Sequence, residues 1–185
     1  MLLDTYLPAY HFHEVNTLMI NGEAKQIYTA IKELDFTRSK VLTALFTMGG
    51  LVRVPHTRLT LQGFLHNGFS LLEERPGDEM VIGTLWRAPL PPLRIERPPR
   101  MSAEAFLQFH EPGYAKLAWN FSLHPSGKKQ AIVRTETRVY CLDPKTKRQF
   151  SCYWLLVGPA SYATRCIMLQ LVREALLQDK AETSR

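Results

Sequence analysis

The chain has 185 residues and a net charge of +6, with 45% hydrophobic and 22% charged residues. This is an ordinary globular composition, and a chain of this length can bury roughly 70% of the surface that it exposes when unfolded. No apolar run reaches the roughly 18 residues of a membrane span, and the start MLLDTYLPAY lacks the basic and apolar regions of a signal peptide. We therefore expect a single domain, residues 1–185, in a soluble, cytoplasmic protein.

The first predicted elements are a strand and two helices. Segment 11–20 is rich in β-branched and aromatic residues and ends at the turn signal Asn21-Gly22, which predicts a strand. Segment 23–34 has apolar residues at helical spacing, and a second short helix follows it before Gly49-Gly50.

A hairpin and a proline-rich connection come next. Segment 51–62 contains Pro55, which forbids a regular helix there, so we interpret it as a loop or an edge element. Segments 64–74 and 79–87 flank an Arg-Pro-Gly-Asp turn and predict a β-hairpin. Segment 88–100 holds five prolines and is expected to form a long surface connection.

The longest predicted ladder lies in the second half of the chain. A short helix opened by Ser102 ends at Pro112-Gly113. Segment 114–124 then alternates cleanly and segment 131–140 returns after a Pro-Ser-Gly turn, which predicts two long antiparallel strands. One face of the first of these strands carries Ala115, Leu117, Trp119, Phe121 and Leu123.

A long helix is predicted for residues 143–177. Asp143 can cap it, and Pro144 suits the first helical position because its missing N–H would be unbonded there anyway. Apolar residues recur at three- and four-residue steps along one face, aromatic in the first half and aliphatic in the second. Gly158-Pro159 predicts a kink or a two-part helix.

Little in the sequence indicates a metal site, a reactive thiol or a catalytic nucleophile. Cys141, Cys152 and Cys166 show no CxxC spacing and are expected to be free thiols in a reducing compartment. His11 and His13 could share a strand face, but no further ligand follows at a telling spacing, so no metal or cofactor is expected. The chain has no GxSxG motif and no glycine-rich phosphate loop, so no catalytic constellation is visible.

Basic residues gather in segments 87–100 and 128–148. A nucleic acid or an anionic membrane could use such clusters, but they fall in loops and helix starts rather than along one groove-reading element. We interpret them as a solvated surface and expect no specific nucleic-acid partner.

The order of elements predicts an α+β fold, because only the last helix is long enough to cover the apolar face of the sheet. This order, and the residues below, resemble the START-like (SRPBCC) superfamily, which includes Bet v 1-like and polyketide cyclase/dehydratase-type proteins, and within it a bacterial group. The resemblance implies a helix-grip fold: a curved antiparallel sheet around a long, kinked C-terminal helix, with an elongated cavity between them. Members bind sterols, lipids, plant hormones and polyketides, and some are cyclases or hydroxylase subunits. The resemblance is carried by segments 72–77, 112–116, 119–121 and 135–139, with Phe150, Tyr153, Trp154, Pro159 and Arg165.

Candidates for the cavity wall are mainly aromatic, and each could equally be plain core. Core is the favoured interpretation for Trp119, whereas Tyr153 and Trp154 suit either role. The candidate ligand-binding residues are Trp86, Tyr114, Trp119, Glu136, Arg138, Phe150, Tyr153, Trp154 and Met168.

The charged pair Glu136 and Arg138 depends on which face of its strand points inward. The strand's own pattern favours Thr135 and Thr137 inward, with the charges outside in solvated pairs of little energy. The resemblance favours the opposite, a carboxylate and a guanidinium inside an apolar cavity, where such groups are usually functional.

Three functions are weighed. The leading hypothesis is a protein that holds a small hydrophobic or amphipathic ligand, such as a lipid, polyketide or aromatic compound. The second is a cyclase- or dehydratase-type enzyme, which requires at least two of Glu136, Arg138 and a tyrosine to converge on the cavity. The third is an interaction module or homodimer that uses the proline-rich segment.

Overall fold

A computed structural model describes residues 1–48, 59–66, 68–87, 100–127 and 129–183. Five antiparallel strands form one sheet in the order β1-β5-β4-β3-β2. The helices are short except for the last one. The elements in chain order are α1 (Leu2–Tyr6), β1 (Phe12–Asn21), α2 (Ala24–Glu33), the 3-10 turn η1 (Phe36–Arg38), α3 (Lys40–Met48), α4 (Leu61–His66), β2 (Ser70–Arg75), β3 (Glu79–Arg87), α5 (Ala103–Gln108), β4 (Tyr114–Pro125), β5 (Gln130–Cys141) and α6 (Pro144–Thr183).

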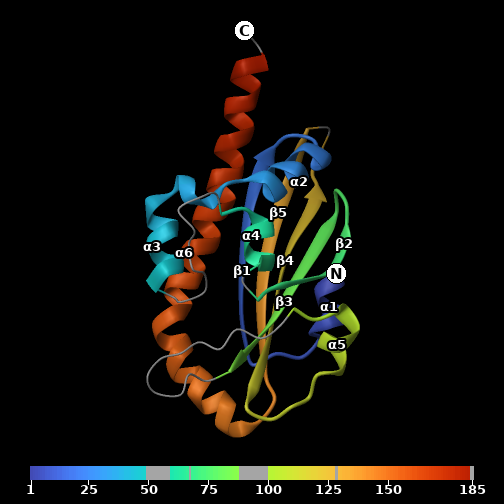
Figure 1. The fold of residues 1–185 in the computed structure, drawn as a ribbon. Coiled ribbons are helices and arrows are strands. Elements are labelled where there is room, and N and C mark those ends of the chain that lie inside the picture. Colours follow the sequence, from blue (N-terminus) through green and yellow to red (C-terminus); the bar gives the residue numbers. More distant parts are fainter. Residues whose placement is uncertain (49–58, 67, 88–99, 128, 184–185) are drawn as a thin grey trace.

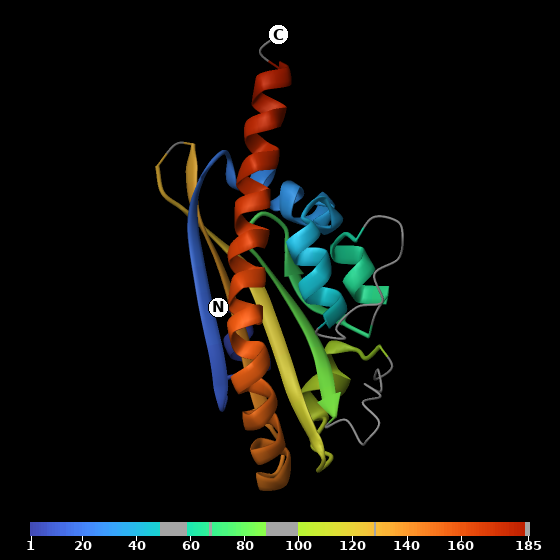
Figure 2. The same cartoon turned by 90° about the vertical axis from the view of Figure 1, so that its left-hand side faces the viewer.

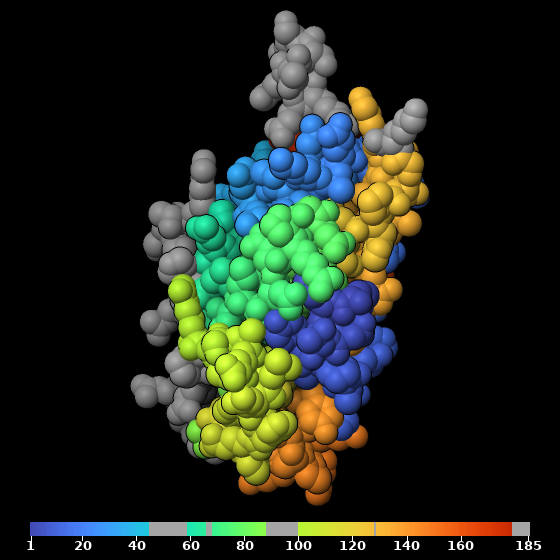
Figure 3. Space-filling view, turned by 90° about the vertical axis from the view of Figure 1, so that its right-hand side faces the viewer, coloured from blue at the N-terminus to red at the C-terminus, as the bar shows by residue number. Residues whose placement is uncertain are grey.

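The sheet curves around α6, which runs along its concave face (Figures 1 and 2). Alternation along the strands sends Trp119, Phe121 and Val133 into the core on this face, where they meet the second half of α6 and helices α2 to α4. On the convex face, Val81 and Leu85 pack under α1 and α5. Figure 3 shows α1 lying between the β2–β3 hairpin and α5. The predicted α+β arrangement, a curved sheet gripping a C-terminal helix, is confirmed.

Helix α6 begins as predicted. The Asp143 carboxylate accepts the backbone N–H groups of Lys145 and Thr146, both at 2.9 Å, and also that of Gly113 at 2.7 Å. Hydrogen bonds from Thr146, and then from these backbone groups, lower the pKa of Asp143 to about 2. The same carboxylate therefore caps α6 and holds the chain just before β4.

Pro159 lies inside α6 without dividing it, so the two-part helix is wrong. Gly158 brings the backbone close to Trp154, whose ring would stand 3.4 Å from a Cβ at this position. Segment Pro144–Gln178 is long and apolar enough to cross a membrane, a property that core helices of soluble proteins share. Here one side of the helix packs on the sheet.

Two local predictions differ from the structure. The strand expected from residue 64 begins at Ser70, because Phe64 belongs to α4 and its ring packs edge-on against Trp119 and Phe36. Helix α1 was not predicted, since five residues carry no periodic signal. Of the two segments interpreted as loops, 51–62 and 88–100, residues 51–58 and 88–99 lie outside the described residues, and the end of the first, Leu61 and Gln62, begins α4.

Candidate ligand cavity between the sheet and the C-terminal helix

A cavity of about 220 Å³ lies between the concave face of the sheet and α6. Leu156 belongs to its wall although its side chain is 82% exposed, so the cavity opens beside this residue. Helix α4 and the residue before β2 contribute Phe64 and Phe69, and the sheet contributes Ile82, Leu117, Trp119 and Thr137. Helix α6 contributes Phe150, Tyr153, Trp154, Leu156, Val157, Ala160, Ser161, Thr164 and Arg165.

A row of paired residues crosses the sheet beneath the cavity. Glu14 on β1 pairs with Thr137 on β5, Thr137 pairs with Trp119 on β4, and Trp119 pairs with Ile82 on β3. Directly paired residues project to the same face of a sheet. The row therefore places a carboxylate, a hydroxyl and an indole side by side under α6.

Arg165 of α6 lies over this row and is only 8% exposed. Its guanidinium carbon is 3.6 Å from the centre of the Trp119 indole ring, a close cation–π contact. Its Nε atom is 4.0 Å from Glu14 Oε1, and Nη1 donates a long hydrogen bond to the Met168 sulfur at 3.8 Å. Burial lowers the pKa of Arg165 to about 9, and the charge of Glu14 offsets part of this effect.

Glu14 is the counter-charge at this end of the cavity. Ser161 on α6 donates a hydrogen bond to Glu14 Oε1 at 2.8 Å. Burial raises the pKa of Glu14, and the Arg165 charge and the Ser161 hydrogen bond oppose that rise. Burial therefore disfavours the charged form of each partner, and the opposite charge 4.0 Å away favours it.

Three polar atoms of the cavity wall have no hydrogen-bond partner within the described part of the chain. They are Thr137 Oγ1, Trp119 Nε1 and Arg165 Nε, and all three are buried. A buried polar atom without a partner costs about 1–3 kcal/mol. The two nitrogens can only donate hydrogen bonds, so this end of the cavity is rich in donors.

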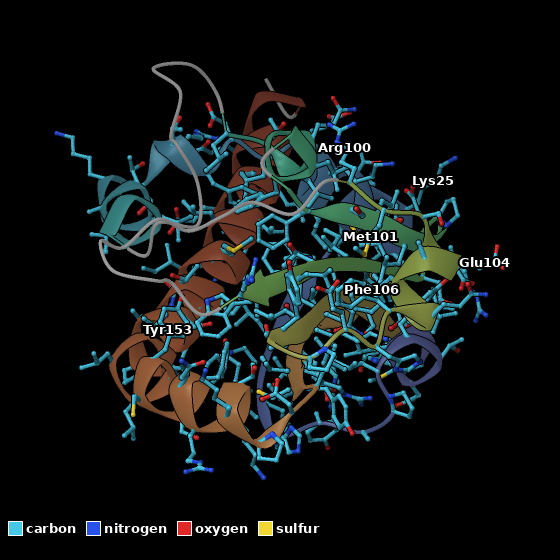
Figure 4. All side chains as sticks on the ribbon, turned by 60° about the horizontal axis from the view of Figure 1, so that its bottom comes forward. Lys25, Arg100, Met101, Glu104, Phe106 and Tyr153 are labelled. Atoms are coloured by element: carbon cyan, nitrogen blue, oxygen red, sulfur yellow. The ribbon has the colours of Figure 1, made fainter. Side chains whose placement is uncertain are left out.

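The other end of the cavity is aromatic. Phe150 stacks with Trp154 at 5.7 Å between ring centres and lies tilted against Tyr153 at 5.5 Å. Burial raises the pKa of the Tyr153 hydroxyl. In Figure 4, Tyr153 on α6 and Phe106 on α5 mark the two opposite sides of the sheet. Apolar rings at one end and polar donors at the other make the cavity amphipathic.

The structure brings together four of the nine predicted site residues: Trp119, Phe150, Tyr153 and Trp154 line the cavity. Trp86 lies behind Phe150, with its ring edge-on at 4.9 Å. Met168 is fully buried in the core beside Arg165.

The remaining three predicted site residues do not line the cavity. Tyr114 packs against Phe109, away from the cavity. Glu136 and Arg138 lie on the convex face of the sheet, beneath α1. Arg138 Nε donates to Glu136 Oε1 at 2.7 Å, and Arg134 Nη2 donates to Glu136 Oε2 at 2.6 Å. Asp4 of α1 lies 2.8 Å from Arg138 Nη1. Burial opposes the charge of Glu136, but the two guanidinium groups outweigh it and hold its pKa below the usual range.

These contacts correct both interpretations of the charged pair. Thr137 lines the cavity and Glu136 and Arg138 face away from it, so the cavity placement is wrong. The strand's own pattern assigned the correct face, with Thr137 inward and the charges outside, but the charges are buried there rather than solvated, because Glu136 is 2% exposed. Helix α1 covers the pair, and its first N–H, that of Leu2, donates to Glu79 Oε2 at 2.7 Å.

Several residues of the candidate cavity were not predicted. Arg165 was named only within the resemblance, although it interrupts an apolar stripe at a position that faces the sheet. Ser161 and Thr164 fell on that stripe as small residues. The alternation of β1, with Glu14 two residues from Asn16 and both on the inner face, was the signal that could have found the carboxylate.

No protein-family model matches the chain, and no curated protein matches it. The matching solved structures include a START superfamily protein from Mycobacterium smegmatis, 10% identical over 90% of this chain and 99% of that chain, with a TM-score of 0.34. Truncated norcoclaurine synthase from Thalictrum flavum is 11% identical over 91% of this chain and 96% of that chain, with a TM-score of 0.37. A protein from Thermus thermophilus is 10% identical over 91% of this chain and 99% of that chain, with a TM-score of 0.38.

Overlaps of this size carry no argument about ligand or chemistry. The architecture rests on the chain's own topology: an antiparallel sheet in the order β1-β5-β4-β3-β2, closed on its concave face by α6. The chain therefore has a helix-grip arrangement, a curved antiparallel sheet around one long C-terminal helix.

Proposed function

We propose that this protein binds a small apolar or amphipathic molecule in the cavity between the sheet and α6. The observation that carries the proposal is the space itself, about 220 Å³ bounded by aromatic and aliphatic side chains. Protein interiors are packed about as densely as organic crystals and leave few voids larger than a water molecule. A cavity of this size in the middle of the fold therefore favours a ligand.

The size of the cavity favours a compact ligand. Pockets for drug-sized molecules usually hold about 300–1,000 Å³, and an engineered apolar cavity of about 150 Å³ takes up benzene. A molecule of one ring, or one short chain with a polar end, matches the space available. A longer ligand would project through the opening beside Leu156.

The enzyme alternative loses its stated basis. It required two of Glu136, Arg138 and a tyrosine at the cavity, and among these only Tyr153 lines it. Glu136 and Arg138 instead bind α1 on the other face. Binding without chemistry is the function that the geometry supports better.

Native mass spectrometry of the purified protein tests the proposal, with Ala160→Phe as the blocking variant. Ala160 lines the cavity, so a phenyl group there fills it. Ala163→Phe is the matched control, because Ala163 lies three residues along the same helix and outside the cavity wall. We expect a co-purified small molecule with wild type and control, and its loss from Ala160→Phe. Equal retention of the molecule by Ala160→Phe would contradict the proposal.

A further inference from the structure

The polar end of the cavity presents donors and few acceptors. Arg165 is buried, yet among the described residues its hydrogen-bond and ion-pair partners are a carboxylate oxygen at 4.0 Å and a thioether sulfur at 3.8 Å. A buried guanidinium with contacts this weak is unusual, because burying an ion is favourable only when hydrogen bonds satisfy its protons. Arg165 therefore has N–H groups that a hydrogen-bond acceptor in the cavity could satisfy.

Two further unsatisfied atoms flank the guanidinium. Trp119 lies in contact with Arg165 and has no partner for Nε1 among the described residues, and Thr137, paired with Trp119 across β4 and β5, has none for Oγ1. Arginine, an indole N–H and a hydroxyl share one complement, an oxygen acceptor with a negative charge. A carboxylate offers two such oxygens in the plane that a guanidinium prefers.

We propose that the cavity selects a compact monocarboxylate, whose carboxylate is held by Arg165, Trp119 and Thr137 and whose apolar body points toward the aromatic end. This inference rests on the proposed binding function and names the ligand class. Trp154 and Arg165 are eleven residues apart on α6, or about 16 Å along the helix axis. A compact aryl-alkanoic acid or short-chain fatty acid is shorter than this distance. With its charge at Arg165, its ring or chain therefore lies along the apolar wall of Trp119, Val157 and Ala160, before Trp154 is reached.

The charge of the site favours a monoanion over a dianion. Glu14 already balances Arg165 at 4.0 Å. One added carboxylate leaves a single extra negative charge beside a guanidinium and two neutral donors. A phosphate monoester would bring about two, with no second cation lining the cavity within the described part of the chain. Carboxylate binding is thus the better match in both geometry and charge.

The test compares an acid with its isosteric amide. Binding of 3-phenylpropionate and of 3-phenylpropionamide is measured by calorimetry on the wild-type protein, with octanoate and octanamide as the aliphatic pair. A hydrogen bond to a charged group contributes about 1.5–3 kcal/mol, so we expect each acid to bind about 10- to 100-fold more tightly than its amide. This comparison needs no variant and stands whatever the folding of a mutant.

Arg165→Met should abolish this preference, and Arg165→Lys should keep part of it. Arg173→Met is the matched control, the same change at an exposed position of the same helix, and it should keep the full preference. Amides that bind as tightly as acids would overturn the carboxylate inference while leaving the binding function in place. If neither acids nor amides bind, and Ala160→Phe loses no co-purified molecule, both proposals fall.

Discussion

The guanidinium of Arg165 rests on the face of the Trp119 indole, 3.6 Å from the ring centre, and this stack joins α6 to the middle strand of the sheet. A buried cation–π contact contributes about 2 kcal/mol. The stack also holds Arg165 at the polar end of the cavity. Two variants separate the contact from simple ring burial.

Trp119→Phe keeps a ring face for the cation, whereas Trp119→Leu removes it. We expect Trp119→Phe to lower the free energy of unfolding by about 1–2 kcal/mol through lost volume, and Trp119→Leu to lower it by about 3 kcal/mol or more. Urea denaturation followed by circular dichroism measures both. Equal losses for the two variants would show that the stack adds nothing.

Thr137→Val should stabilise the protein. The change keeps the shape of the side chain and removes a buried hydroxyl that has no partner among the described residues, so the free energy of unfolding should rise by about 1 kcal/mol. Thr135→Val is the control on the same strand, because Thr135 Oγ1 donates to the Asn120 carbonyl at 2.7 Å. It should lose about 1 kcal/mol. The opposite signs distinguish an unsatisfied hydroxyl from a satisfied one.

Glu14→Gln tests the raised pKa of Glu14. The folded state binds the proton of Glu14 more tightly than the unfolded state, whose pKa is near 4.5. Ionisation of Glu14 therefore removes stability as the pH rises from the unfolded-state pKa through the higher pKa of the folded state. Wild type minus Glu14→Gln should show a difference in melting temperature that falls across this range. Other acids titrate equally in both proteins, so a flat difference would mean that burial does not shift Glu14.

Arg138→Met should destabilise the protein without touching the cavity. Its loss leaves the Glu136 carboxylate buried with one guanidinium partner, Arg134, and breaks the ion pair to Asp4. We expect a loss of about 3 kcal/mol. Arg134→Met, at a side chain 34% exposed, should lose less.

The destabilisation caused by Arg138→Met should be localised at α1. Hydrogen exchange should show faster exchange of the α1 amides in Arg138→Met, because α1 is held by Asp4 and by the bond from Arg138 to the Leu7 carbonyl. Ligand affinity should stay at the wild-type value, since the pair lies across the sheet from the cavity. Lost affinity with unchanged α1 exchange would place the role of Arg138 elsewhere.

The parts of the fold that depend on local patterns were predictable. The cap at Asp143, the alternation that sends Trp119 and Phe121 inward, and the order of strands around one long helix all follow from short-range spacing. Thr137 was also placed inward by its own strand's pattern.

What could not be predicted depends on residues far apart in the chain. No sequence pattern near Glu136 indicates that α1, more than a hundred residues earlier in the chain, covers this side chain. Arg165 was a break in an apolar stripe, and only the fold shows that its guanidinium stays inside, on an indole from β4. The periodicity of a segment predicts which face a side chain occupies, but it does not predict which residues of the opposite element contact that side chain.

The alternation of β4 and β5 has a further effect on folding fidelity. Thr135 and Thr137 serve one face of β5, while Glu136 and Arg138, the residues between and beside them, serve the other. A slip of one residue in this hairpin would send the carboxylate and the guanidinium into the aromatic cavity and strip α1 of its anchor at once. Misregistered chains therefore lose stability on both faces of the sheet, and both losses favour the correct pairing.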